Sequence, residues 1–205
     1  MGSVSAIKEE SIRRMIAYSS VAQIGYIYMG FGLGTEIGVV ASIYHVLSHA
    51  ATKSLLFIAA SGLTDASGDS VRYEELHGAG FRHRLAGAAF TVGALSMVGL
   101  PMFSGFISKL LFAQAAMGHE YKMLITLIAL AVSTILNAVY FMKTVIRIYT
   151  PASQDGESKG NRIIHMREQP GKSAALICFV ILNLILGLNS EPVIHMIEAG
   201  LEMFR

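Results

Sequence analysis

The stretch Ile37-GVVASIYHVLSHAATKSLLFIAAS-Gly62 carries three ionisable residues, His45, His49 and Lys53, spaced four apart in a largely apolar run. At 3.6 residues per turn, these side chains share one face of a helix. The run is long enough to cross a bilayer, and a charged lysine at the bilayer centre costs about 2.5–3.5 kcal/mol on insertion scales. The stretch therefore predicts a membrane helix whose polar stripe serves an ion or proton path. The alternative is a stripe that only bonds to neighbouring helices.

The composition of the whole chain also indicates a membrane protein. The chain has 205 residues, of which 53% are hydrophobic and 15% are charged, and its mean hydropathy is +0.54. These values are typical of a polytopic membrane protein rather than a soluble domain. The net charge is only +2, and we find no basic aromatic surface, so we expect no nucleic-acid partner. The single cysteine, Cys178, excludes a disulfide framework within the chain.

Apolar runs predict an all-α, polytopic membrane helix bundle with about five transmembrane helices. The runs lie at about 15–33, 37–63, 85–117, 123–148 and 173–188. The tail at 191–205 has a helical apolar period that suits a membrane interface. We divide the chain into a transmembrane domain at 1–149, a cytoplasmic loop at 150–172, and a C-terminal transmembrane helix with its tail at 173–205.

Basic residues gather on one side of this topology. They are Lys8, Arg13, Arg14, Arg72, Arg82, Arg84, Lys143, Arg147, Lys159, Arg162, Arg167 and Lys172. The opposite side carries little beyond Lys122 and Arg205. Because cytoplasmic loops are rich in lysine and arginine, this pattern predicts that the N-terminus and both long polar loops are cytoplasmic and that the C-terminus is outside. This topology requires 85–117 to cross only once.

The third crossing contains an interruption, Gly99-LPMFS-Gly105. Pro101 removes a backbone donor, and Gly99 and Gly105 weaken the helix on either side. A broken helix is tolerated in a membrane only where it is buried in protein or lines a wet cavity. Lys109 follows the break and has apolar neighbours, which favours a buried ion site. The alternative is a simple proline kink, with Lys109 extending to an interface.

A zinc site at His45 and His49 is one chemical interpretation of the polar stripe. Histidines at i and i+4 share a face and can bind one metal ion. No Asp, Glu or Cys accompanies them within 37–62, and the positive charge of Lys53 would repel a cation. We therefore expect no metal and no cofactor.

A proton relay fits the same residues better. Histidine titrates near neutral pH, and a poorly solvated lysine can exchange protons. Successive groups lie about one helical turn, roughly 5.4 Å, apart, so transfer between them needs bridging water. Ser48 and Thr52 lie on nearby faces and could hold such water, as could Tyr44.

Two further polar features belong to the first and fourth crossings. Ser19, Gln23 and Tyr26 form a polar edge at helical spacing, which fits hydrogen bonding between helices as well as it fits a water path. Lys143 and Arg147 end the fourth crossing, and we interpret them as anchors on the cytoplasmic side.

Four ordered motifs together resemble one family. They are RRMIAYSSVAQIGYI at 13–27, HVLSHAATKSLLF at 45–57, GLPMFSGFISK at 99–109 and STILNAVYFMK at 133–143. They are similar to the C-terminal part of the antiporter-like, proton-conducting membrane subunits of respiratory complex I, membrane-bound hydrogenases and Mrp sodium/proton antiporters. The resemblance covers about residues 1–148.

This resemblance implies two inverted repeats of five helices, each forming a half-channel with a broken helix, linked by a hydrophilic axis at mid-membrane. It matches Lys109 to the broken-helix lysine of the second repeat. It matches His45, His49 and Lys53 to the central axis. Arg13 stands where the family usually has a lysine. Since arginine stays charged at physiological pH, we expect Arg13 to set a local field rather than to carry protons.

The expected function is that of the C-terminal half of a proton- or sodium-translocating membrane subunit, relaying protons through Lys109, Lys53, His49, His45 and water. The implied partners are other membrane subunits, the lipid bilayer, and protons or sodium ions, in a prokaryotic plasma membrane. No nucleotide loop or redox ligand set suggests catalysis by the chain alone. The chain has about half the length of family members, and we expect a fragment. Its length and Arg13 favour the alternative, a non-conducting structural or assembly subunit.

Overall fold

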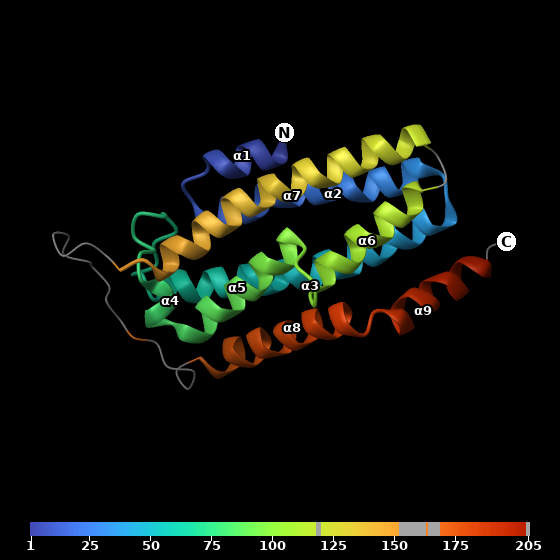
Figure 1. The fold of residues 1–205 in the computed structure, drawn as a ribbon. Helices are drawn as coiled ribbons and strands as arrows, with labels where there is room; N and C mark the ends of the chain where they lie inside the picture. The colour runs from blue at the N-terminus through green and yellow to red at the C-terminus, as the bar shows by residue number, and fades with distance from the viewer. Residues whose placement is uncertain (118–119, 152–162, 164–168, 204–205) are drawn as a thin grey trace.

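The computed structural model describes residues 1–117, 120–151, 163 and 169–203, which fold as an all-α bundle with one isolated β-bridge (Figure 1). The helices are α1 (Gly2–Lys8), α2 (Ile12–Leu33), α3 (Glu36–Asp65), α4 (Ala79–Arg82), α5 (Arg84–Val98), α6 (Ser104–Ala116), α7 (Glu120–Tyr149), α8 (Pro170–Leu188) and α9 (Glu191–Glu202). The predicted helical membrane fold, with one broken helix between α5 and α6, is confirmed.

Three of the described helices, α3, α7 and α8, are long and apolar enough to cross a membrane. The other two expected crossings are α2, which has 22 residues, and the pair α5 and α6. The loop predicted at 150–172 lies largely outside the described residues, and α8 already begins at Pro170.

Helix α3 is the central element, because it packs against α2, α5, α6 and α8. Its N-cap is Thr35, whose side chain accepts a hydrogen bond from the Gly38 N–H at 3.1 Å. Just before it, α2 ends at Gly34 in the left-handed conformation, φ 70°, which glycine adopts without strain. The chain therefore turns back within a few residues, and α2 and α3 lie side by side (Figure 1).

One end of the bundle, here called the basic end, gathers the α1–α2 link, residues 66–83, the end of α7 and the start of α8 (Figure 1, left). Its described basic side chains are Lys8, Arg13, Arg14, Arg72, Arg82, Arg84, Lys143, Arg147 and Lys172. The turn between α2 and α3 and the start of α7, with Lys122, lie at the opposite end. The basic residues that the sequence assigned to one side of the membrane thus lie at one end of the bundle, and the prediction that this end faces the cytoplasm stays a prediction.

Both ends of the chain differ in detail from the sequence-based expectation. Residues 2–8, for which the sequence predicted no helix, form the short helix α1, which packs against α2 and α7. The amphipathic tail forms α9, which places Val193, Ile194 and Ile197 against a buried cluster that includes Tyr44 and Phe112. In each case, the apolar face of the segment packs against other helices of the bundle.

Candidate functional site: the polar interior at the broken helix

The break between α5 and α6 is set by a few backbone positions. Gly99 ends α5 with φ 87°, and Met102 has φ 80°, a conformation that costs a non-glycine residue energy. A side chain at Gly99 would meet Lys109, because an added Cβ would lie 2.9 Å from its Nζ. Glycine at this position is therefore needed both for the turn and for the approach of Lys109.

Lys109 crosses the break and caps the end of α5. Its Nζ donates to the Val98 carbonyl at 2.5 Å and to the Thr134 hydroxyl of α7 at 2.8 Å. The last carbonyls of a helix lack partners within the helix and carry partial negative charge, so a cation is stabilised there. Lys109 is therefore partly buried, rather than fully buried as expected, at a helix end that the break itself creates.

A chain of hydroxyl groups links the break to α3. The Ser48 hydroxyl donates to Ser104 at 2.8 Å, Ser104 lies 3.3 Å from Ser96, and Ser96 lies 3.4 Å from Thr52. The ends of α5 and α6 can approach in this way because Gly105 lies directly against the Ser96 carbonyl, where no side chain would fit. The break therefore brings the hydroxyls on both of its sides to the polar face of α3.

The histidines lie next to this chain. His45 Nδ1 lies 3.0 Å from the Ser108 hydroxyl, and the rings of His45 and His49 stack with their centroids 5.9 Å apart. His45 Nε2, His49 Nδ1 and Gln23 Nε2 are buried without a hydrogen-bond partner among the described residues. Buried polar atoms almost always have a partner in protein or water, and a water molecule at this place could supply one.

A small cavity accompanies these atoms. It has a volume of about 10 Å³, and its lining consists of Gln23, His45, Ser48, His49, Thr52, Ser96, Met97, Gly105 and Lys109. A cavity of this size accommodates about one water molecule. The structure thus brings Lys109, both histidines, Ser48 and Thr52 together around one water-sized space.

Lys53 does not line this cavity. Its Nζ donates to the Ile16 carbonyl at 2.6 Å and to the Ser19 hydroxyl, both in α2. Each step of four residues rotates the side-chain direction by about 40°, so two steps from His45 carry Lys53 toward a different neighbouring helix. The stripe predicted from the sequence therefore divides, with its histidines facing the break and its lysine facing α2.

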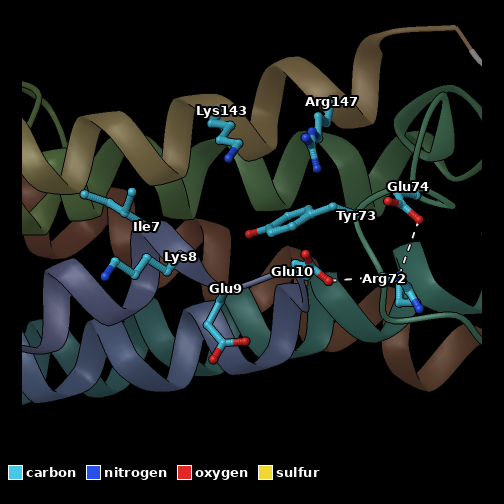
Figure 2. A pocket seen from close by; sticks show the side chains of 9 residues that line it. All are labelled: Ile7, Lys8, Glu9, Glu10, Arg72, Tyr73, Glu74, Lys143 and Arg147. Atoms are coloured by element: carbon cyan, nitrogen blue, oxygen red, sulfur yellow. Dashed lines mark hydrogen bonds and ion pairs between the residues drawn. The ribbon is translucent and has the colours of Figure 1, made fainter.

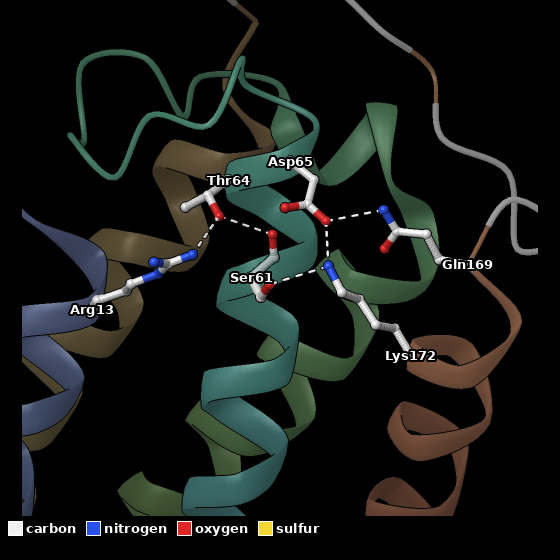
Figure 3. A network of polar contacts seen from close by, with 6 residues as sticks. All are labelled: Arg13, Ser61, Thr64, Asp65, Gln169 and Lys172. Carbon is white, nitrogen blue, oxygen red and sulfur yellow. Dashed lines mark hydrogen bonds and ion pairs between the residues drawn. The ribbon is translucent and has the colours of Figure 1, made fainter.

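Two other predicted residues also lie outside the cavity. The Tyr44 hydroxyl donates to the Leu186 carbonyl, so it joins α3 to α8. Arg13 lies at the basic end, where it donates to the Thr64 hydroxyl at 3.2 Å (Figure 3). Beside it, Lys172 of α8 pairs with Asp65 at 2.6 Å, with Gln169 also bonded to that carboxylate.

Several polar residues of the site were not predicted from the sequence. Asn183 of α8 is fully buried and donates to Thr52 at 2.7 Å, while its Oδ1 has no described partner. Ser104 and Ser108 also went unrecognised, as did Thr134. A signal was present for two of these helices: in α8, Asn183 is the lone amide in an apolar run, and in α6 the two serines lie four residues apart directly after the break.

The site suits protons better than metal ions. Its lining includes two imidazoles, an ammonium group and three hydroxyls, and no carboxylate. Among the described residues, no group of three or more His, Cys, Asp and Glu is placed to hold a metal. Groups of this kind can bind, release and pass protons through an intervening water.

Comparison with known proteins agrees with this architecture. Residues 1–136 match the profile of the family described as NADH:quinone oxidoreductase/Mrp antiporter, TM. NADH-quinone oxidoreductase subunit N of Desulforudis audaxviator is 32% identical over 204 residues, covering 94% of this chain and 39% of the relative. A subunit of the Na(+)/H(+) antiporter of Alkalihalophilus pseudofirmus is 28% identical, covering 94% of this chain and 37% of the relative. The chain thus spans about two fifths of the length of these curated relatives.

Solved structures show the same similarity. A chain of the membrane-bound sulfane sulfur reductase, an archaeal respiratory membrane complex, superposes with a TM-score of 0.78 at 30% identity, over 98% of this chain and 39% of that chain. A chain of the Mrp complex from Dietzia sp. superposes with a TM-score of 0.77 at 25% identity, over 94% of this chain and 42% of that chain. With most of its length matched by the family profile, by relatives and by these folds, the chain belongs to the NADH:quinone oxidoreductase/Mrp antiporter transmembrane family.

Proposed function

We propose that this chain forms the second-repeat half of a proton-translocating membrane subunit in a respiratory, hydrogenase or Mrp-type complex. In this proposal, Lys109, His49 and His45 exchange protons through water in the small cavity. The observation that carries the proposal is the cavity itself, which places an ammonium group and two buried, unpartnered imidazole nitrogens around one water-sized space. The other membrane subunits of that complex and the lipid bilayer are the proposed partners.

Lys53 is the second lysine of the proposed relay. It lies one turn beyond His49 on α3, and its Nζ is bound to α2. Proton exchange between Lys53 and His49 therefore needs either further water or release of the ammonium group from the Ile16 carbonyl. Two positive charges one turn apart repel each other, so protonation of His49 would favour release of a proton by Lys53.

The relay is tested with Lys109→Ala in the complete subunit, assembled in its host complex and reconstituted into vesicles. We expect proton flux to fall about a hundredfold or more, since a positioned proton-transfer group contributes about 10²–10⁴-fold. Lys109→Arg should also lose flux, because arginine keeps the positive charge at Val98 but does not release its proton. Normal pumping by an assembled Lys109→Ala complex would exclude the role.

Lys122→Ala is the matched control. Lys122 Nζ donates to the Leu33 carbonyl at 2.9 Å, so it caps the end of α2 as Lys109 caps the end of α5. Both alanine variants lose a cation at a helix end, but only Lys109 lines the cavity. We expect similar losses of thermal stability from both variants and a loss of flux from Lys109→Ala alone.

The alternative function is that of a structural subunit that conducts nothing. The contacts of Lys109 favour this alternative. Its ammonium group donates hydrogen bonds to the Val98 carbonyl and the Thr134 hydroxyl, and these bonds could serve only to hold the helices together. This alternative predicts that Lys109→Ala and Lys122→Ala lower stability equally and leave flux unchanged. The flux measurement therefore separates the two functions directly.

A further inference from the structure

A second cavity, of about 320 Å³, lies at the basic end (Figure 2). We call it the basic cleft and define it by its lining, residues 7–10 at the end of α1 and in the α1–α2 link, residues 72–74, Lys143 and Arg147. Figure 2 shows that Lys143 and Arg147 extend from α7 toward Tyr73, which lies between α7 and the α1–α2 link. Neither the proposed relay nor the orientation of the chain explains why a cavity of this size lies here.

The wall of the basic cleft is held by backbone hydrogen bonds. Ser11 and Arg72 form an antiparallel bridge, in which the Ile12 N–H donates to the Val71 carbonyl at 3.0 Å and the Tyr73 N–H donates to the Glu10 carbonyl at 2.9 Å. The α1–α2 link and the 71–73 segment are thus fastened to each other, and the lining side chains start from fixed positions.

The carboxylates of the basic cleft already have partners. Glu9 pairs with Arg14 at 2.8 Å. Glu10 and Glu74 both approach Arg72, at 4.0 and 3.5 Å (Figure 2). These pairs account for all three acidic groups of the lining.

Three basic residues of the cleft lining are left over after these pairs. Within the described part of the chain, Lys8, Lys143 and Arg147 have no carboxylate within ion-pair distance. Lys8, Arg14, Arg72, Lys143 and Arg147 together outnumber the three glutamates, which leaves the cleft and its immediate partners with a surplus of two positive charges. A group with one or two negative charges would balance this surplus.

The guanidinium of Arg147 is oriented to bind such an anionic group. It lies over the Tyr73 ring, 5.2 Å from the ring centroid. Stacking on an aromatic ring orients a guanidinium and leaves its N–H edge free to bind a phosphate with two parallel hydrogen bonds. Tyr73 adds no negative charge, since burial raises its pKa to about 12 and its hydroxyl lies 2.9 Å from that of Thr144.

An apolar path leads along α7 to the basic cleft. Val132, Ile135, Val139 and Ile146 are about half exposed or more, and their spacing places them on one face of the helix. Lys143 lies four residues after Val139 and three before Ile146, on the same face. A lipid whose acyl chain lies along this stripe would therefore bring its phosphate to Lys143.

We propose that the basic cleft binds the phosphate of an anionic lipid headgroup, held by Lys143, Arg147 and Lys8, with the acyl chains along the exposed stripe of α7. The cytoplasmic leaflet, which the basic end faces by the positive-inside rule, is the leaflet rich in anionic lipids. The site is separate from the proton relay, and failure of either proposal leaves the other standing.

The test measures lipid binding to the complete subunit, purified in its complex and stripped of lipid. The probes are phosphatidylglycerol, zwitterionic phosphatidylethanolamine and inorganic phosphate, each titrated while native mass spectra are recorded. We expect phosphatidylglycerol to bind the most tightly. Lys143→Gln and Arg147→Gln should each weaken that binding about fivefold, the effect of about 1 kcal/mol per basic residue.

Arg84→Gln is the control variant. Arg84 is an exposed basic residue at the same end of the bundle but outside the cleft lining, so its loss removes one charge without touching the site. Equal weakening by Arg84→Gln and Lys143→Gln would reduce the effect to general surface charge and overturn the proposal. Equal affinity for the two lipids would do the same. Displacement of phosphatidylglycerol by inorganic phosphate at a comparable concentration would assign the site to free phosphate and overturn the lipid assignment.

Discussion

The polar interior and the basic end satisfy their polar groups in different ways. In the interior, hydroxyls, an imidazole and an amide bond to one another, and the two lysines bond to helix carbonyls, with no ion pair to a carboxylate among the described residues. At the basic end, arginines and lysines pair with glutamates and Asp65, and most of these side chains are partly exposed. Neutral partners keep the interior lysines free to lose a proton without leaving an unpaired negative charge, whereas exposed ion pairs are permanently charged. Positive charge can therefore be gained or lost in the interior, whereas it stays fixed at the basic end.

The largest expected effect is a loss of proton flux, and it tests whether Lys53 belongs to the part of the interior that exchanges protons. Lys53→Met in the complete subunit should lower proton flux about a hundredfold, as expected for loss of a positioned proton-transfer group. Stability should change little, because an apolar side chain of similar length replaces a buried cation. Flux is measured in reconstituted vesicles, with Lys122→Ala as the reference for a lysine outside the relay. Unchanged flux would confine the relay to Lys109, His49 and His45.

The next effect concerns the backbone that creates the interior. Gly105→Ala should destabilise the fold by about 2–3 kcal/mol, because an added Cβ would overlap the Ser96 carbonyl. Gly25→Ala in α2 should instead stabilise it by about 0.5–1 kcal/mol, since no atom of the described residues lies within 4 Å of its added Cβ and alanine favours a helix. Thermal unfolding in detergent gives both values. Opposite signs are the expected outcome, and a neutral Gly105→Ala would show that the break can relax.

A smaller effect is expected at the contact between α8 and the interior. Asn183→Leu removes the donor to Thr52 and the unpartnered Oδ1 together. We expect a loss of about 1 kcal/mol, the usual value of one buried hydrogen bond. Ile181→Leu, an exposed position on the same helix, serves as the control and should have no effect. An equal loss of stability in Ile181→Leu would mean that any change of packing in α8 lowers stability.

The smallest effect is expected for the ion pair between Asp65 and Lys172. Both side chains are partly exposed, and exposed pairs contribute less than about 1 kcal/mol. Asp65→Asn should therefore shift thermal unfolding only slightly, and the shift should vanish at high salt because ions screen exposed charges. A large shift that persists at about 1 M salt would contradict the fixed, weakly stabilising role that we assign to the basic end.

Much of the fold follows from local patterns. Apolar runs of membrane length predict α2, α3, α7 and α8, and Gly99 with Pro101 predicts the break, because helix formation and helix interruption depend on residues close in sequence. The position of Lys109 just after the break, and the basic clusters that orient the chain, are equally visible in the sequence. The four motifs also place the chain in its family, as the profile match confirms.

The partners of the polar side chains could not be predicted in the same way. Helical spacing places His45, His49 and Lys53 on one side of α3, but the packing of α2 and α6 against that side decides which partner each one reaches. The same holds for Tyr44, which bonds to α8, and for Asn183, which reaches Thr52 across 131 positions of sequence.

By itself, the sequence determined a bundle of membrane helices, one break with a lysine beside it, and a basic end, since each of these depends on hydrophobicity, helix propensity or charge within a short segment. Only the tertiary structure decided that the break gathers Ser96, Ser104 and Ser108 against α3, that Lys53 of α3 bonds to α2, and that residues 72–74 close a cleft with α7. The physical reason is that hydrogen bonds and ion pairs act over about 3–4 Å, and such distances between distant segments are set by how whole helices pack.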